Sequence, residues 1–208
     1  MKFSRFFSAV SVSLLVAAAA EAAHVDMSDP RRAVGREDNI RVDAALLQDS
    51  ISPSSPLSVT YQIENLTNET IGVADKVSDV SYDPDTATIT LSIGAEVPTG
   101  KAMPHVVTIG PGQKRVLSAG GLVHIVAPRQ RTPWSAVPRY VQIKVNVLRD
   151  VRPFAALVEQ QTASNAAPAL PGNLFDKWVD ENDAIFLNSL PVHWSGRDAS
   201  SEGDISER

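Results

Sequence analysis

The residues that could carry acid–base or metal chemistry are scattered along this sequence. Its four histidines are His24, His105, His124 and His193. None of them forms a His-x-His or His-x3-His pair, and no carboxylate stands beside them at a spacing that builds a metal site locally. We therefore predict no metal and no cofactor. The alternative, a ligand-binding or metal-binding envelope protein, requires distant residues to converge in the fold.

Motifs for catalysis are also missing. The sequence contains no Gly-x-Ser-x-Gly element, no phosphate-binding loop and no dinucleotide fingerprint. It has no cysteine, which excludes thiol nucleophiles, thiolate metal sites and disulfides. We predict that the protein is not an enzyme. A hydrolase is a further alternative, and it requires that the fold bring His105, His124 or His193 close to a serine or a carboxylate in a cleft.

Positive charge is concentrated in one stretch of a chain whose formal net charge is -5. Between residues 129 and 152 the only acidic residue is Asp150, and the basic ones are Arg129, Arg131, Arg139, Lys144, Arg149 and Arg152. Arginine suits two-pronged contacts with carboxylates or phosphates. We predict a binding surface for a partner or an anion, formed by Arg129, Arg131, Trp134 and Arg139. Alternatively, these cations pair with the acidic side chains of residues 176–208.

The C-terminal part of the chain carries four large aromatic residues: Phe175, Trp178, Phe186 and Trp194. Large aromatic side chains are costly to leave in water. Either this extension folds back over a sheet, or it presents anchors to another protein. Under the second interpretation Trp178 and Trp194 join the predicted binding residues.

The first residues have the three parts of a secretory signal. Lys2 and Arg5 precede an apolar run over residues 6–20, and small residues stand at Ala20 and Ala22. The run is about 15 residues long, short of the roughly 20 that a membrane-spanning helix needs. We predict cleavage after Ala22, with an uncleaved anchor as the alternative, and no transmembrane segment after cleavage. Because the chain also lacks cysteine, we predict a periplasmic or secreted bacterial protein.

Strict alternation of apolar and polar residues dominates the middle of the chain. It is clearest at Leu57–Ile63, Ala87–Ile93 and Tyr140–Leu148, and it is the pattern of half-buried strands. Turn signals separate these runs at residues 65–70, 83–86 and 110–112, and we predict a bulge or corner at Gly120 and Gly121. This strand spacing resembles that of immunoglobulin-like envelope domains. We predict an all-β fold with one immunoglobulin-like antiparallel β-sandwich, and a β-barrel as the runner-up.

The predicted organisation has five parts. Residues 1–22 are the signal, 23–38 an N-terminal arm, 39–150 the β-sandwich, 151–194 a C-terminal extension that packs on it, and 195–208 a disordered acidic tail. The extension is expected to begin with a linker and to contain at most one short helix. That helix would be capped by Asn173 and would carry Leu174, Phe175 and Trp178 on one side.

The composition narrows the function without naming one. The chain has 208 residues and is 43% hydrophobic, which suits one domain that folds around a core. Its acidic balance argues against a nucleic-acid binder, which needs a basic surface to neutralise phosphates. We therefore predict an exported, non-enzymatic accessory or interaction module with an envelope protein as its possible partner.

Overall fold

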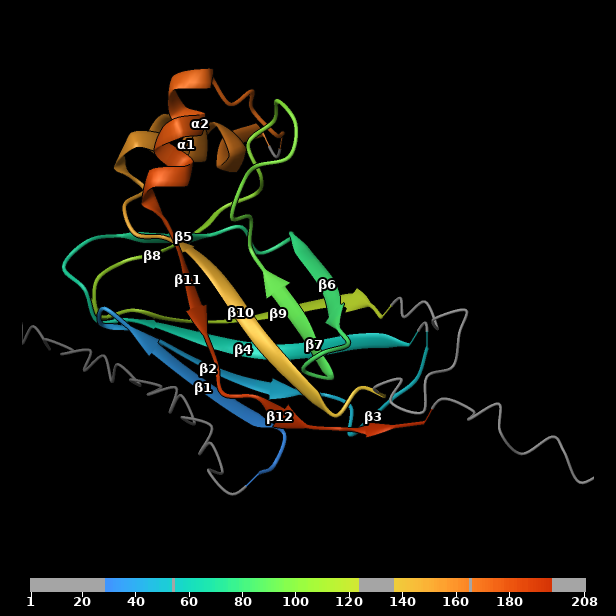
Figure 1. The fold of residues 1–208 in the computed structure, drawn as a ribbon. Helices are drawn as coiled ribbons and strands as arrows, with labels where there is room; N and C mark the ends of the chain where they lie inside the picture. The colour runs from blue at the N-terminus through green and yellow to red at the C-terminus, as the bar shows by residue number, and fades with distance from the viewer. Residues whose placement is uncertain (1–28, 54, 124–136, 165, 196–208) are drawn as a thin grey trace, which may run out of the picture.

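The computed structural model describes residues 29–53, 55–123, 137–164 and 166–195. In these residues the protein is mainly β, with several sheets and two α-helices (Figure 1). The predicted signal and residues 196–208 of the predicted tail lie outside the described residues.

Four strands form an antiparallel sheet in the order β1, β2, β4, β9. They are β1 (Arg32–Glu37), β2 (Ile40–Leu46), β4 (Pro56–Asn65) and β9 (Lys114–Leu122). Strand β4 shows why the sequence forms this sheet, because each apolar residue that alternates with a polar one is buried: Leu57, Val59, Tyr61 and Ile63. Strand β1 lies in the segment predicted as an arm. Since it pairs with β2 along its whole length, residues 32–37 belong to the sheet.

The second large sheet is built around β10 (Tyr140–Leu148). Its other strands are β5 (Ile71–Val73), β6 (Ser78–Asp83), β7 (Thr88–Ile93), β8 (Val107–Ile109), β11 (Asn182–Phe186) and β12 (Leu190–Pro191). Val145 shows why β10 is central, because it pairs with Ile93 of β7 and with Ile185 of β11. These two partners must occupy opposite edges of β10.

The prediction that all strands pair antiparallel is wrong in two places. Strand β7 runs parallel to β10, and β3 (Ser50–Ile51) runs parallel to β13 (His193–Trp194). Parallel neighbours need a long connection that returns the chain to the starting end of the sheet. Residues 94–139, between β7 and β10, are long enough to do so.

The buried faces of the two large sheets enclose one hydrophobic cluster, to which both sheets contribute. The sheets also touch along their edges. The Ser78 hydroxyl donates to the Gly120 carbonyl on one side, and the Val34 N–H donates to the Asn188 side chain on the other. In the described residues, however, no ladder joins the two sheets. The β-rich fold is therefore confirmed, while the immunoglobulin-like sandwich and the β-barrel stay predictions.

The prediction of at most one short helix is wrong. A 3-10 turn (η1, Arg152–Phe154) leads into α1 (Ala155–Ser164), and α2 (Gly172–Glu181) follows. The segment that becomes α1 was expected to be partly linker, yet it lacks glycine and proline and is rich in alanine, glutamine and other helix formers. Gln161 anchors α1, because its buried side chain accepts from the Val106 N–H and donates to the Pro104 carbonyl.

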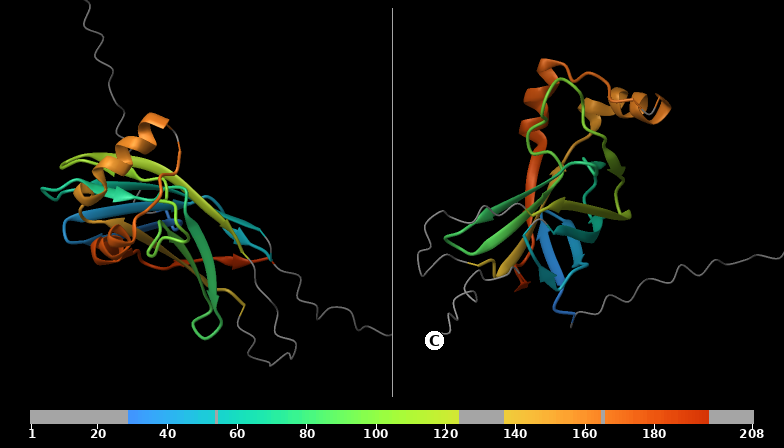
Figure 2. Two further views of the ribbon diagram at one scale, coloured as in Figure 1. Left: turned by 90° about the horizontal axis from the view of Figure 1, so that it is seen from above. Right: turned by 90° about the vertical axis from the view of Figure 1, so that its right-hand side faces the viewer.

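The helices gather at one end of the sheets rather than on a face (Figures 1 and 2). There they cover a second hydrophobic cluster that includes Met103, Leu148, Phe154 and Trp178. As predicted, Leu174, Phe175 and Trp178 of α2 share the side that faces this cluster. The predicted cap is wrong, because α2 begins at Gly172 after Pro171 and has no side-chain cap.

Two predicted turns have the expected geometry. Gly112 has φ 69°, and the Gln113 N–H donates to the Gly110 carbonyl at 3.1 Å, as in a type II turn. In the β6–β7 turn, the Asp83 carboxylate accepts from the Asp85 N–H at 3.0 Å and from the Thr86 hydroxyl at 2.8 Å. The hydrogen bond from Thr86 is the main reason that the pKa of Asp83 is lowered.

The predicted break at Gly120 and Gly121 is wrong, because β9 continues through both residues. These glycines instead allow close approach. A Cβ on Gly121 would lie 2.5 Å from Cγ2 of Val80 in β6, and one on Gly120 would lie 2.9 Å from the Leu57 carbonyl oxygen. Gly121 is therefore needed where β9 meets the second sheet, and Gly120 where β9 lies against β4.

We expect Gly121→Ala to lower the free energy of unfolding by about 1–3 kcal/mol, because the added methyl group overpacks the contact with Val80. Urea-induced unfolding of the purified protein measures this change. Gly172→Ala is the matched control, since its Cβ would meet nothing within 4 Å. Equal midpoints for the two variants would contradict the prediction.

Candidate functional site

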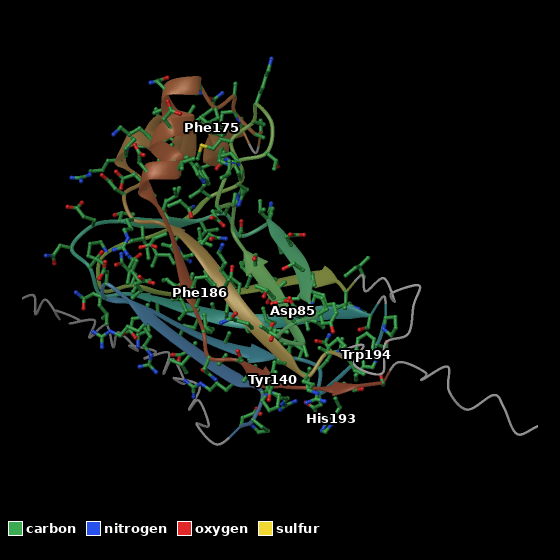
Figure 3. The ribbon with its side chains drawn as sticks, viewed as in Figure 1. Asp85, Tyr140, Phe175, Phe186, His193 and Trp194 are labelled. Atoms are coloured by element: carbon green, nitrogen blue, oxygen red, sulfur yellow. The ribbon has the colours of Figure 1, made fainter. Side chains whose placement is uncertain are left out.

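Of the six predicted binding residues, the structure describes Arg139, Trp178 and Trp194, and it does not bring Trp178 together with the other two. Arg129, Arg131 and Trp134 lie outside the described residues. Trp178 is 0% exposed in the second hydrophobic cluster, so its ring is a core group. Trp194 is half-buried against the main cluster. Figure 3 places it at the end of the molecule opposite Phe175 and the helices.

Arg139 and Trp194 do lie near the same end of the sheets. The Val192 N–H donates to the Arg139 carbonyl at 2.9 Å, and Val192 is two residues before Trp194. Arg139 is exposed, and its side chain forms no ion pair within the described residues. Among the described cations of the basic stretch, Arg139 is therefore the one that stays exposed and without an ion pair.

Three other cations of the basic stretch are paired within the molecule. Lys144 pairs with Glu96, Arg149 with Asp38 and Asp183, and Arg152 with Asp150 and Glu69. The Arg152 guanidinium holds the pKa of Asp150 below its ordinary value, chiefly through their hydrogen bond. Of these partners only Asp183 comes from residues 176–208. The intramolecular interpretation is therefore confirmed for Arg149, and the positive stretch is less available to a partner than its charge suggests.

A second charged group lies on the outer face of the four-stranded sheet. Asp43 of β2 pairs with Arg32 at 3.2 Å and with Arg41 at 3.1 Å. The Arg32 side chain is only 6% exposed, and within the described residues its Nε and Nη1 atoms have no hydrogen-bond partner. On the same face Lys114 of β9 pairs with Glu64 of β4 at 3.0 Å. Charges of both signs therefore neutralise one another across the strands on this face.

Strand β9 borders this face, and its hydrogen-bond pattern defines which of its groups point away from β4. The Asn65 N–H donates to the Gln113 carbonyl at one end of the ladder, and the Val123 N–H donates to the Ser55 carbonyl at the other. Hydrogen-bonded pairs recur at every second residue of an antiparallel ladder. Odd-numbered residues of β9 therefore bond to β4, and even-numbered ones direct their N–H and C=O groups outward.

An independent contact agrees with this assignment. The carbonyl of Gly120, an even-numbered residue, accepts a hydrogen bond from the Ser78 hydroxyl of β6. Beyond this contact, the outward N–H and C=O groups of Lys114, Val116 and Ser118 have no partner in the part of the chain that the structure describes. Val116 is also 64% exposed. Residues 114–118 thus form an open strand edge.

Such an edge is a template for pairing with another strand, and proteins commonly cover or disrupt it. Here no strand, proline or bulge does so along residues 114–118 of the described chain. The position of β9 at the rim of its sheet was not predictable from the sequence, because the order of strands in a sheet does not appear in the alternation of residue types.

One histidine reaches a carboxylate. His105 Nδ1 lies 2.7 Å from the Asp75 carboxylate. The same carboxylate also affects Tyr61. Burial is the main reason that the pKa of the Tyr61 phenol is raised, and the negative charge of Asp75 is the second reason. No serine hydroxyl bonds to His105 in the described part of the chain, and no three metal-ligating side chains converge there. His24 and His124 lie outside the described residues, and His193 is exposed in β13.

Comparison with protein-family models, curated proteins and solved structures found no match for this chain. Among the described residues, neither helix combines the length and the apolar character that a bilayer-spanning helix requires. The candidate site therefore depends on its geometry alone, and the open edge of β9 is the feature with the most defined chemistry.

Proposed function

We propose that this chain is an exported, non-enzymatic interaction module of the bacterial envelope, and that it binds partners by accepting an extended segment at the edge of β9. The observation that carries the proposal is the row of N–H and C=O groups at Lys114, Val116 and Ser118, which have no partner among the described residues. Strand addition uses such groups for affinity and the neighbouring side chains for specificity. The signal-like residues 1–22 support the envelope as its location.

The architecture that we propose is an immunoglobulin-like sandwich with the helices as an end cap. Support comes from the cluster that the two large sheets share. A fold of this kind serves many functions, so the proposal rests on the edge and not on the architecture.

Val116→Pro tests the edge without disturbing the sheet. The Val116 N–H points away from β4, so proline there removes an outward donor and leaves the β4–β9 ladder complete. We expect a tagged Val116→Pro protein to melt close to the wild-type temperature and to lose the proteins that the wild type retains from envelope extract. Affinity capture with mass spectrometry measures this loss.

Val116→Thr is the matched control, because it keeps the N–H group and a β-branched side chain of similar size. It should retain the same proteins as the wild type. The proposal is overturned if Val116→Pro retains them equally well, or if the wild type retains none.

The metal-binding and hydrolase alternatives have less support. The His105–Asp75 pair is the one observation that favours a hydrolase, and it lacks a nucleophile among the described residues. Metal analysis of the purified protein after equilibrium dialysis tests the metal-binding alternative, and a stoichiometric metal would replace our proposal with it.

A further inference from the structure

We propose that the strand accepted at this edge is β9 of a second copy of the chain, so that the protein forms a two-fold dimer through antiparallel β9–β9 pairing. The inference rests on the proposed function, because it identifies the occupant of the same open edge. It adds a defined register, which follows from the hydrogen-bond pattern and the charges of β9.

The hydrogen-bond pattern restricts the register. Only even-numbered residues of β9 direct their N–H and C=O groups outward, so an even-numbered residue must face an even-numbered residue of the second copy. In a two-fold pair this condition holds when the symmetry axis passes midway between a residue and the same residue of the second copy, and that residue is the centre of the pairing. The candidate centres within the open edge are Arg115, Val116 and Leu117.

The charges and the existing contacts favour Val116 as the centre. A centre at Arg115 would place that cation opposite its own copy, and like charges directly opposite each other are destabilising. A centre at Leu117 would place Lys114 opposite Gly120 of the second copy, whose carbonyl already accepts from the Ser78 hydroxyl. With the centre at Val116 no two cations face each other directly, and the residue opposite Gly120 is Gly112, which lies in the turn before β9 and outside the paired segment.

In the Val116-centred register, Lys114 faces Ser118 of the second copy and Arg115 faces Leu117 of the second copy. The three outward-directed residues of each strand then exchange about six hydrogen bonds. Val116, which is 64% exposed in the single chain, meets its own counterpart across the axis. Such a self-complementary contact is what a two-fold interface requires.

The pairing would stop where β6 begins. Strand β6 approaches β9 at Gly120 and Gly121, as the Ser78 hydrogen bond and the Val80 contact show. The second copy is therefore limited to the residue 114–118 segment. A contact of this length is small compared with stable interfaces, so we expect a dimer whose population rises with protein concentration.

Sedimentation velocity over a wide range of concentrations tests the dimer. We expect the wild type and Val116→Thr to associate with similar affinity, and Val116→Pro to associate about 10-fold or more weakly because it lacks one outward donor in each copy. Circular dichroism shows whether each variant remains folded. Monomers at every concentration for the wild type would overturn the inference.

The absence of cysteine allows a direct test of the register. Residues 115 and 117 face each other as a non-hydrogen-bonded pair, whose Cα atoms are about 4.5 Å apart and within reach of a disulfide. We expect a mixture of Arg115→Cys and Leu117→Cys proteins to form mixed disulfide dimers. Either variant alone should cross-link several-fold less, because its two cysteines would be offset along the strands.

The outcomes separate this inference from the proposed function. Cross-linking that is equal in the mixture and in the single variants overturns the register. If Val116→Pro loses envelope partners while the wild type stays monomeric, the edge binds another protein and the self-pairing is wrong. If the wild type dimerises as described but captures no other protein, self-pairing stands and the proposed role in binding envelope partners fails.

Discussion

Trp178→Ala is expected to lower the free energy of unfolding by about 3–5 kcal/mol, the range for removing a large buried aromatic side chain. Trp178 is 0% exposed, and its ring packs edge-on against Phe154 with centroids 5.5 Å apart. Its indole N–H also donates to the Ala95 carbonyl at 2.9 Å. These contacts hold α2 to the end of the sheets. In the variant we therefore expect the helices to unfold before the sheets.

Chemical denaturation followed by far-ultraviolet circular dichroism measures the loss, and hydrogen exchange shows whether α1 and α2 open before the sheets. Trp178→Phe should cost less than the alanine variant, because it keeps an aromatic ring and the Ala95 carbonyl still accepts from Asn182 at 2.8 Å. Val179→Ala is the neighbouring control, since Val179 is 45% exposed. The second cluster has no stabilising role if Trp178→Ala and Val179→Ala unfold at the same midpoint.

The strands with strict alternation were predictable from the sequence. In β7 the buried residues are Ile89, Leu91 and Ile93, and in β10 Val141, Ile143 and Val145 are buried in the same way. Each of these strands has one face in the main cluster, and burial of one face is what produces a two-residue period. The pattern does not specify neighbours, so the parallel pairing of β7 with β10 was missed.

Strand β1 was missed for a different physical reason. Its inward positions are Ala33 and Gly35, which give almost no apolar signal among the surrounding arginines. Small residues are needed there because the other sheet passes close by. A Cβ on Gly35 would lie 2.7 Å from the Phe186 carbonyl oxygen. A strand whose inward side chains must be small therefore lacks a clear alternation of apolar and polar residues, and its sequence resembles a charged N-terminal arm.

The candidate site was predictable only in part. The concentration of positive charge was visible in the sequence, but pairing of Lys144 with Glu96 and of Arg149 with Asp183 depends on segments that come together only in the fold. The open edge of β9 depends on the order of the strands in the sheet. It also depends on which residues of β9, odd-numbered or even-numbered, form hydrogen bonds to β4. Neither property is encoded in local residue types.

Asn65 provides a contrast, because its sequence context indicated a turn but not its burial. It stands at the end of β4 and is 0% exposed. Its side-chain amide donates to the Glu69 carbonyl at 2.8 Å and to the Ile109 carbonyl at 2.9 Å. Its side-chain oxygen accepts from the Thr67 N–H at 3.0 Å and from the Thr67 hydroxyl at 2.7 Å. One side chain thus joins the turn after β4 to β8 in the other sheet.

We expect Asn65→Ala to lower the free energy of unfolding by about 2–4 kcal/mol, because it removes these hydrogen bonds and takes the amide donor away from the Ile109 carbonyl, whereas the Glu69 carbonyl still accepts from the Thr67 hydroxyl at 3.0 Å. Urea denaturation measures the change. Asn68→Ala, an exposed position in the same turn, should change stability by no more than about 0.5 kcal/mol.

Asn65→Asp separates the two donated hydrogen bonds from the two accepted ones. The carboxylate can still accept from Thr67, but it places an anionic oxygen opposite the Glu69 and Ile109 carbonyls. Burial and these carbonyls should raise the pKa of Asp at this position above its ordinary value. A group with a raised folded-state pKa loses its contribution to stability as the pH rises through that pKa. We therefore expect the deficit relative to wild type to be larger at pH 7 than at pH 4, whereas a deficit that is the same at both would show that the pKa of the introduced carboxyl group is not raised in the fold.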